Sequence, residues 1–360
     1  MSTNRILPLL WAFAGLAALY CGSSNAADSG QPTGPHAPVK QIADQHVVIK
    51  TPEGTGLLPV YADRPIDAAA PDVRRVLIIV HGILRNADVY FQSGQEAVQA
   101  AKQAGRDSMV VAPQFLTSVD AGKFKPSPDT LVWAGSGWRG GEPARSPAPI
   151  SSFAALDGLL EHFANRSLYP ALKTVVVAGH SAGAQVVQHY AVVGHGEAML
   201  ADNGVSVQYV VANPSIYLYF DESRPTQGAL QPADAASCPD VNRWLYGMTD
   251  APAYVASQHV DELEARYVRR NVVYLLGTAD TNPYTHFIDR SCAAMAQGPY
   301  RFARGLAYFD YLKRRDASAL KQRVVEVPGI GHDNRGMFTS VCGLAVLFGE
   351  TVPSVCPQIP

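Results

Sequence analysis

The sequence lacks an excess of charge of either sign. It holds 29 lysines and arginines against 31 aspartates and glutamates, so the formal net charge is -2, and charged residues make up only 17% of the chain. No basic patch suited to nucleic acid and no acidic tail is present, so a nucleic-acid partner is not expected. No internal repeat is visible. Because 47% of the 360 residues are hydrophobic, one large core is possible, and binding partners are expected in pockets.

Cysteine is also scarce, with five in the chain. No C-x-x-C or H-x-x-x-H spacing occurs, so neither a metal site nor another cofactor is predicted. Cys21 lies in the N-terminal leader, which leaves an even set in the remaining chain. In an oxidising compartment we expect Cys238 to pair with Cys292 and Cys342 with Cys356, while four buried thiols are the alternative.

No apolar run is long enough to span a bilayer comfortably. Residues 6–20 form a short apolar stretch after a positively charged start, and small residues lead up to Ala26. This pattern predicts a signal peptide over residues 1–26, hence export to the periplasm or beyond without stable membrane insertion. Lipidation at Cys21 is the alternative, but Tyr20 is large for the position before a lipidated cysteine.

A Gly, Pro and Ser-rich stretch over residues 27–40 follows and reads as a flexible linker. Residues 41–360 are expected to form one domain in which strands and helices alternate. The region over residues 113–149 is loop-like, and residues 213–268 read as an insertion or lid between two strands, the first ending near Ala212 and the second near Leu276. The expected strands cover residues 47–50, 57–62, 76–80, 109–112, 174–177, 205–212, 271–276 and 323–327. The expected helices cover residues 86–104, about fifteen residues from 151 or 152, the segment after Ser181, 289–296, 300–314 and 337–348.

The most informative stretch is a β-branched apolar run over residues 174–177 that leads into Gly179-His-Ser-Ala-Gly183 and then a helix-like segment. The two glycines let the strand reverse sharply into the helix while Ser181 sits exposed at the turn. The backbone N–H of Ala182 is left without a helical partner and is the expected first oxyanion donor. A Gly-rich structural turn is the alternative.

A second apolar strand, over residues 76–80, runs into His81-Gly82. The backbone amide of Ile83 or Leu84 is the candidate for the second oxyanion donor, and Gly82 is expected to leave room for the substrate oxygen. An ordinary strand exit is the alternative interpretation.

An acid and a base follow two later strands. Asp280 comes after the strand over residues 271–276, and His332 after the strand over residues 323–327. Parallel strands end at one edge of their sheet, so these side chains are expected to meet Ser181 there. A neutral histidine can take the serine proton, and a carboxylate can orient the ring. Asp289 and Asp333 are the alternative acids.

The order Ser, Asp, His and the Gly-x-Ser-x-Gly motif resemble the α/β-hydrolase family. The resemblance implies a mostly parallel, doubly wound sheet of about eight strands with helices on both faces. It also implies that Ser181 is the nucleophile, His332 the general base and then acid, and Asp280 the orienting carboxylate.

Three aromatic residues are candidates for lining the substrate pocket, although core packing is an equally plain role for them: Trp133, Trp138 and Tyr217. The sequence therefore predicts an exported serine hydrolase that cleaves a small-molecule or polymeric carboxylic ester through an acyl-enzyme. A serine peptidase or amidase and a non-catalytic binding protein are the alternatives.

Overall fold

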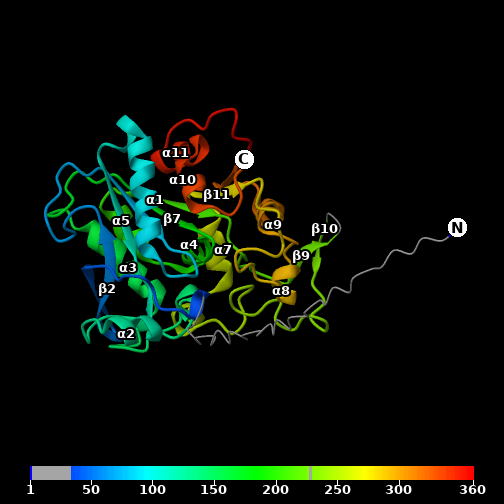
Figure 1. Cartoon of the computed structure of the whole chain (residues 1–360), viewed down its shortest axis with the longest axis horizontal. Coiled ribbons are helices and arrows are strands. Elements are labelled where there is room, and N and C mark those ends of the chain that lie inside the picture. Colours follow the sequence, from blue (N-terminus) through cyan, green and yellow to red (C-terminus); the bar gives the residue numbers. More distant parts are fainter. Residues whose placement is uncertain (2–33, 227–228) are drawn as a thin grey trace. The chain divides into compact units, whose positions relative to one another are not determined.

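The computed structural model describes residue 1, residues 34–226 and residues 229–360 (Figure 1). Apart from Met1, the predicted signal peptide over residues 1–26 lies outside the described residues, as do the lipidation alternative at Cys21 and the linker up to residue 33. Within the described part of the chain, no helix combines the length and the apolar character needed to cross a bilayer.

A nine-stranded sheet in the order β1-β2-β4-β3-β7-β8-β11-β12-β13 forms the centre of the fold. The strands from β4 to β12 in this order are parallel, whereas β1, β2 and β13 add to the edges in antiparallel fashion. This confirms the predicted mostly parallel sheet, with one strand more than expected. The strands are β1 (Gln45–Thr51), β2 (Gly54–Ala62), β3 (Arg75–Val80), β4 (Ser108–Pro113), β7 (Thr174–His180), β8 (Ser206–Ala212), β11 (Val272–Gly277), β12 (Arg323–Val327) and β13 (Gln358–Ile359).

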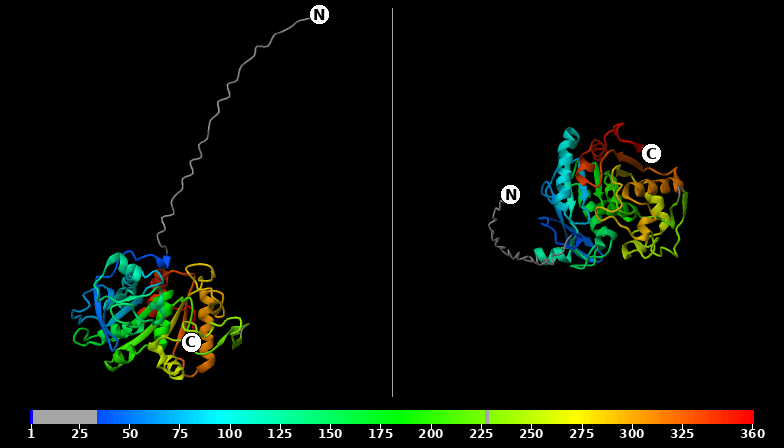
Figure 2. Two further views of the ribbon diagram at one scale, coloured as in Figure 1. Left: turned by 90° about the horizontal axis from the view of Figure 1, so that it is seen from below. Right: turned by 45° about the vertical axis from the view of Figure 1, so that its right-hand side comes forward.

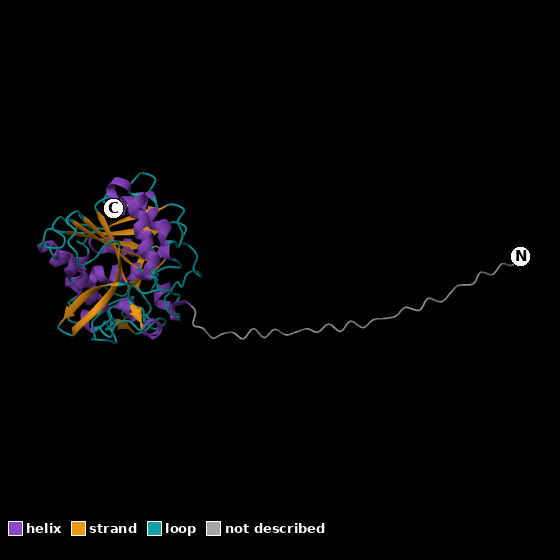
Figure 3. Ribbon diagram, turned by 60° about the vertical axis from the view of Figure 1, so that its left-hand side comes forward, coloured by secondary structure: helices purple, strands orange, loops and turns teal. Residues whose placement is uncertain are grey.

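Both faces of the sheet are buried, which explains why its inner strands are apolar throughout. In β3, Val76, Ile78 and Val80 belong to one hydrophobic cluster, while Leu77 and Ile79 belong to a second cluster on the other face. Figure 2 shows one helix from each layer, α1 in cyan and α9 in orange, on opposite sides of the molecule, and Figure 3 shows strands between helices. The second cluster is covered by α1 (Ala87–Ala100), α10 (Asn334–Thr339) and α11 (Val341–Phe348); the first is covered by α3 (Ser152–Ala164), α4 (Ala182–Val193), α5 (Gly196–Asp202), α7 (Val260–Tyr267) and α9 (Arg301–Asp316).

Three segments differ from the sequence-based expectation. The region over residues 113–149 contains a helix and two short strands rather than loop alone. The predicted closing helix over residues 337–348 is broken at Ser340, whose extended backbone (ψ 156°) and side chain cap α11. The insertion contains a β-hairpin and two helices. The additional elements are η1 (Gly34–His36), η2 (Lys102–Gly105), β5 (Leu116–Thr117), α2 (Ser118–Phe124), β6 (Val132–Trp133), η3 (Gly137–Gly140), β9 (Ser223–Thr226), β10 (Ala229–Pro232), α6 (Ala253–Ala256) and α8 (Cys292–Met295).

The linker prediction is wrong for residues 34–40, because buried polar contacts attach them to the domain. Arg85 forms a buried ion pair with Asp120, at 2.7 Å between Nε and Oδ2. Its two terminal nitrogens donate to the carbonyl oxygens of Pro35 and Ala37 at 2.6 and 2.7 Å. Asp120 also accepts the backbone N–H of Val39. The ordered domain therefore begins before residue 41.

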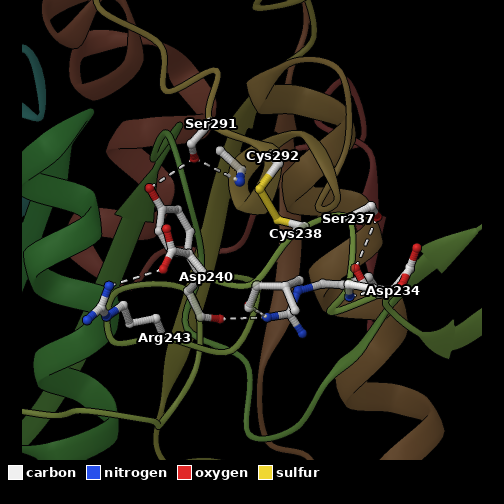
Figure 4. The surroundings of a disulfide bond; sticks show 12 residues. Asp234, Ser237, Cys238, Asp240, Arg243, Ser291 and Cys292 are labelled. Carbon is white, nitrogen blue, oxygen red and sulfur yellow. Dashed lines mark hydrogen bonds and ion pairs between the residues drawn. A yellow bond between two sulfur atoms is a disulfide. The ribbon is translucent and has the colours of Figure 1, made fainter.

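Both predicted disulfides are present. Cys342 and Cys356 join α11 to the C-terminal segment. Cys238, in the insertion, bonds to Cys292 at the start of α8 (Figure 4). This second bond attaches the insertion to the loop that precedes α8, and the same loop also borders the site described next.

Candidate active site

A sharp turn between β7 and α4 presents Ser181. This residue has φ 59° and ψ -125°, a backbone conformation that is unfavourable for any residue other than glycine. Such strain is typical of the strand-to-helix turn that exposes a nucleophilic serine. A Cβ at Gly183 would lie 2.1 Å from the carbonyl oxygen of Val80, and a Cβ at Gly179 would lie 2.4 Å from the backbone of Gly183. Both glycines are therefore required by close backbone approach, as the motif predicts.

The carboxyl edge of the sheet brings three predicted residues together. His332 Nε2 lies 2.9 Å from Ser181 Oγ, and His332 Nδ1 lies 2.7 Å from Asp280 Oδ2. The alternative acid Asp289 is elsewhere, since it accepts the hydroxyl of Tyr246 at 2.7 Å. A hydroxyl, an imidazole and a carboxylate thus form one hydrogen-bonded chain, the arrangement that activates a serine.

Asp280 is buried against a cation that the sequence analysis did not identify. Its side chain is 2% exposed, and Arg301 Nη1 lies 3.6 Å from its Oδ1. Burial raises the pKa of Asp280, and the Arg301 guanidinium opposes this rise. Arg301 also donates to the carbonyl oxygens of Thr285 and His286. One buried guanidinium therefore connects the carboxylate to the loop beside the site.

His332 is held in its neutral form by its surroundings. Burial lowers its pKa well below the ordinary value for histidine, and the neighbouring Arg301 and His286 side chains act in the same direction. The carboxylate of Asp280 opposes this effect. The rings of His180 and His286 lie 4.4 and 5.2 Å from the His332 ring, measured between centroids. His332 is therefore a free base at neutral pH, ready to accept a proton.

His81 and Gly82 shape the loop that follows β3. His81 Nε2 accepts the backbone N–H of Phe115 at 3.0 Å, so the ring proton is on Nδ1, which donates to the Gly82 carbonyl at 2.9 Å. Burial lowers the pKa of His81 to about 4, which keeps this neutral tautomer. A Cβ at Gly82 would lie 2.4 Å from the Tyr90 hydroxyl. Tyr90, rather than the substrate oxygen, is thus the neighbour that requires glycine here.

Asn213 connects the two loops that carry the acid and the base. Its Oδ1 accepts the N–H of Gly277 at 2.9 Å, and its Nδ2 donates to the carbonyl of Gly331 at 3.4 Å. The side chain is fully buried, and φ is 48°, in the left-handed region that asparagine tolerates. Sequence reasoning missed this residue, although its position directly after β8 placed it at the correct edge.

A cavity of about 190 Å³ opens over Ser181. Its walls include Ile83 and Leu84, the two candidates for the second oxyanion donor, together with Phe287. Trp138 borders a neighbouring cavity. By contrast, Trp133 and Tyr217 are fully buried in the main hydrophobic cluster and do not line the serine cavity. Packing, the alternative considered for these two aromatics, is therefore what the structure shows. The cavity is lined by Gly82, Ile83, Leu84, Asn86, Tyr90, His180, Ser181, His286, Phe287, His332, Asp333 and Asn334.

Comparison with known proteins agrees with this geometry. A model of the alpha/beta hydrolase family matches residues 77–340, and because this is most of the chain, the protein belongs to that family of hydrolases. Its structure is similar to that of LpqC, a poly(3-hydroxybutyrate) depolymerase from Bordetella parapertussis, with a TM-score of 0.58, 21% identity, and coverage of 88% of this chain and 93% of that one. It is also similar to poly(aspartic acid) hydrolase-1 from Sphingomonas sp. KT-1, with a TM-score of 0.54, 23% identity, and coverage of 82% and 96%. At these identities the similarity concerns the fold. No curated protein matches the sequence.

Proposed function

We propose that the protein is an exported serine hydrolase that cleaves carboxylic esters through an acyl-enzyme. Ser181 acts as the nucleophile, His332 as general base and acid, and Asp280 as the carboxylate that orients the imidazole. The observation that carries this proposal is the pair of hydrogen bonds at 2.9 and 2.7 Å that joins the three side chains. The lowered pKa of His332 supports it, because a neutral ring is needed at the start of the reaction.

The reaction begins when His332 Nε2 takes the proton from Ser181 Oγ as this oxygen attacks the ester carbonyl carbon. The carbonyl π electrons move to the oxygen and give a tetrahedral oxyanion. The imidazolium then returns its proton to the departing alcohol, and the C–O bond breaks to leave the acyl-enzyme. Water repeats the sequence with His332 as base and releases the acid. Asp280 stays ionised and stabilises the imidazolium.

The oxyanion would be bound by two backbone amides. Ala182 starts α4, so its N–H has no partner within the helix. The Gly82 carbonyl accepts both the His81 ring proton and the Arg85 N–H. Since the C=O and N–H of a trans peptide point in opposite directions, the N–H of Ile83 points away from these donors. This supports Ile83 over Leu84 as the second donor.

The similar structures indicate a substrate class. The two similar structures are described as a polyester depolymerase and a poly(aspartic acid) hydrolase, so a polymeric or oligomeric ester is a reasonable substrate. Amide hydrolysis with the same residues is the second candidate. An amide demands protonation of a poorer leaving group, which an ester does not.

Two measurements test the enzymatic proposal. A fluorophosphonate probe should label the wild-type protein and fail to label Ser181→Ala, with both proteins equally folded by circular dichroism. Initial rates on p-nitrophenyl esters from acetate to palmitate, set beside matching anilides, should show Ser181-dependent ester cleavage. Labelling that persists in Ser181→Ala would mean that another residue is the nucleophile, and faster cleavage of the anilides would favour the amidase.

Export is tested separately. Expression of the full chain in a bacterium with an intact secretion pathway should give an extracytoplasmic protein whose mature N-terminus follows Ala26. The two disulfides support this expectation, because such bonds persist in oxidising compartments. An unprocessed N-terminus, or a lipid attached to Cys21, would contradict it.

A further inference from the structure

A second cavity lies beside the one over Ser181. Its volume is about 290 Å³, and it shares Ile83 and Phe287 with the serine cavity as common walls. The side chain of Phe287 is 62% exposed, so it separates the two spaces without sealing them. A third cavity of about 260 Å³ shares Ser136 and Arg139 with the second. Arg139 therefore borders two spaces that continue away from the nucleophile.

Arg139 is a largely buried cation without a carboxylate partner. In the described parts of the chain, no carboxylate oxygen lies within 4.0 Å of its guanidinium. Among the described residues, it donates to Gln185 Oε1 at 3.4 Å and Ser136 Oγ at 3.3 Å and to no other acceptor. The Nε of Arg139 and the Nε2 of Gln185 are buried without any hydrogen-bond partner among the described residues. An arginine stays charged in such surroundings, and leaving it unpaired is energetically unfavourable.

The other charged groups of the second cavity are already engaged. Arg85 is paired with Asp120. Asp289 accepts the Tyr246 hydroxyl at one oxygen and the Ser291 N–H at the other. Asp289 borders the same cavity and its carboxylate acts electrostatically on Arg139, but among the described residues it forms no ion pair or hydrogen bond with the guanidinium. Of the two arginines that line this cavity, Arg139 is thus the one whose guanidinium has N–H donors left for a ligand.

The position of Arg139 relative to the nucleophile is set by α4. Its partner Gln185 follows Ser181 by four residues, which is about 6 Å along the helix axis. A group bound to Arg139 is therefore within reach of a flexible chain attached to the reacting carbonyl. Glycines at both ends of the loop, Gly135 and Gly141, have φ of 45° and 78°, in the left-handed region that favours glycine.

We propose that Arg139 binds a carboxylate on the substrate, so that the preferred esters carry an anionic group beyond the scissile bond. This inference rests on the proposed ester hydrolysis. The guanidinium offers two parallel N–H donors that match a carboxylate, and the burial of the site strengthens the pairing. Esters of dicarboxylic acids and oligoesters that end in a free carboxylate both have this chemistry.

The test compares two substrates that differ by one charge, 4-nitrophenyl hydrogen suberate and its neutral methyl ester, with the adipate pair for a shorter spacer. Still shorter hemiesters are avoided because their own carboxylate cleaves the ester. We expect wild type to prefer the carboxylate substrate in kcat/KM. Arg139→Gln should reduce this preference by on the order of 10 to 100-fold, mainly through KM. Arg139→Lys should retain part of it, since the charge remains without the paired geometry.

The matched control is Arg145→Gln, an exposed arginine of the same region, which should leave the preference unchanged. Equal kcat/KM for both substrates in wild type, or an unchanged preference in Arg139→Gln, would overturn the inference. Absence of cleavage of both the carboxylate and the neutral ester by wild type would instead contradict the proposed function. If Arg139→Gln does not fold, inhibition of wild type decides: adipate should inhibit competitively and neutral adipamide should not, and equal inhibition would refute the carboxylate site.

Discussion

Replacement of Arg301 by methionine gives the sharpest test of how the site is tuned. Met fills most of the volume but removes the charge beside Asp280 and the donors to the carbonyls of Thr285 and His286. At 3.6 Å, two unit charges interact by about 4 to 5 kcal/mol at an effective dielectric constant of about 20. This agrees with the loss of about 3 to 5 kcal/mol expected when one member of a buried pair is removed.

The pH dependence follows from the direction of two pKa shifts. The Arg301 charge lowers the pKa of Asp280 and also that of His332. Both values therefore rise in Arg301→Met, and the active combination of ionised Asp280 and neutral His332 is lost at higher pH than in wild type. Activity at pH 5 relative to pH 8 should fall by on the order of tenfold more than in wild type. The loss of stability should be larger at pH 8, where the uncompensated Asp280 is ionised, than at pH 4.

The assay is a pH profile of kcat/KM on one p-nitrophenyl ester, together with urea unfolding at the two pH values. Arg304→Met is the matched control. This arginine is also fully buried on α9, but it donates to the carbonyls of Gly298 and Ser215 and has no contact with Asp280. It should lose stability while the acid limb of the profile stays in place. An acid limb in Arg301→Met that coincides with wild type, with activity reduced equally at every pH, would refute the electrostatic argument.

Three further changes have defined outcomes. Gly82→Ala should lower the free energy of unfolding by about 1 to 3 kcal/mol through overpacking, and should also lower kcat, because its Cβ meets the Tyr90 hydroxyl at 2.4 Å. Combining it with Tyr90→Phe should recover part of the stability and part of kcat. No recovery would mean that the clash involves another residue. Asn213→Ala should cost about 1 to 3 kcal/mol and lower kcat more than it changes KM, measured by thermal unfolding and steady-state kinetics; an unchanged kcat would contradict its positioning role. The double change Cys342→Ser and Cys356→Ser should remove about 3 kcal/mol of stability, given a sequence separation of 14, with kcat intact; reduced kcat in the folded protein would show that this bond supports the site.

The fold was predictable wherever local pattern and tertiary role coincide. The strand over residues 323–327 was predicted with the bounds that the structure has. The strand before Ser181 was placed correctly because its continuous β-branched run has few alternatives to a strand covered on both faces. The meeting of Ser181, Asp280 and His332 was predictable for a related reason. Each residue follows a strand of the parallel sheet, and parallel strands end at one edge. Residues far apart in sequence can therefore lie close together there.

The features that could not be predicted depend on tertiary contacts, which have no signature in the local sequence. The helix α2 was missed because it is only seven residues long, and its capping box of Thr117 and Asp120 lies in a region rich in glycine and proline. Buried arginines are the larger failure. From sequence alone, a charged residue is expected on the surface. Arg85 and Arg301 are nevertheless buried, because carbonyl oxygens of other segments accept hydrogen bonds from their guanidinium groups. Trp133 shows the converse error, an aromatic that lies in the core beside a functional loop.

Buried polar groups hold the loops at one sheet edge around the proposed reaction centre. Asp280, His332 and the oxyanion loop after β3 are each held by fully buried partners, Arg301, Asn213 and His81, that bond to backbone atoms. Phe287 and Arg139 belong instead to loops that surround the edge. The disulfide at Cys292 attaches the loop carrying Phe287 to the insertion. Under the proposed function, changes in those outer loops would alter which ester enters without disturbing the hydrogen bonds that join Ser181, His332 and Asp280.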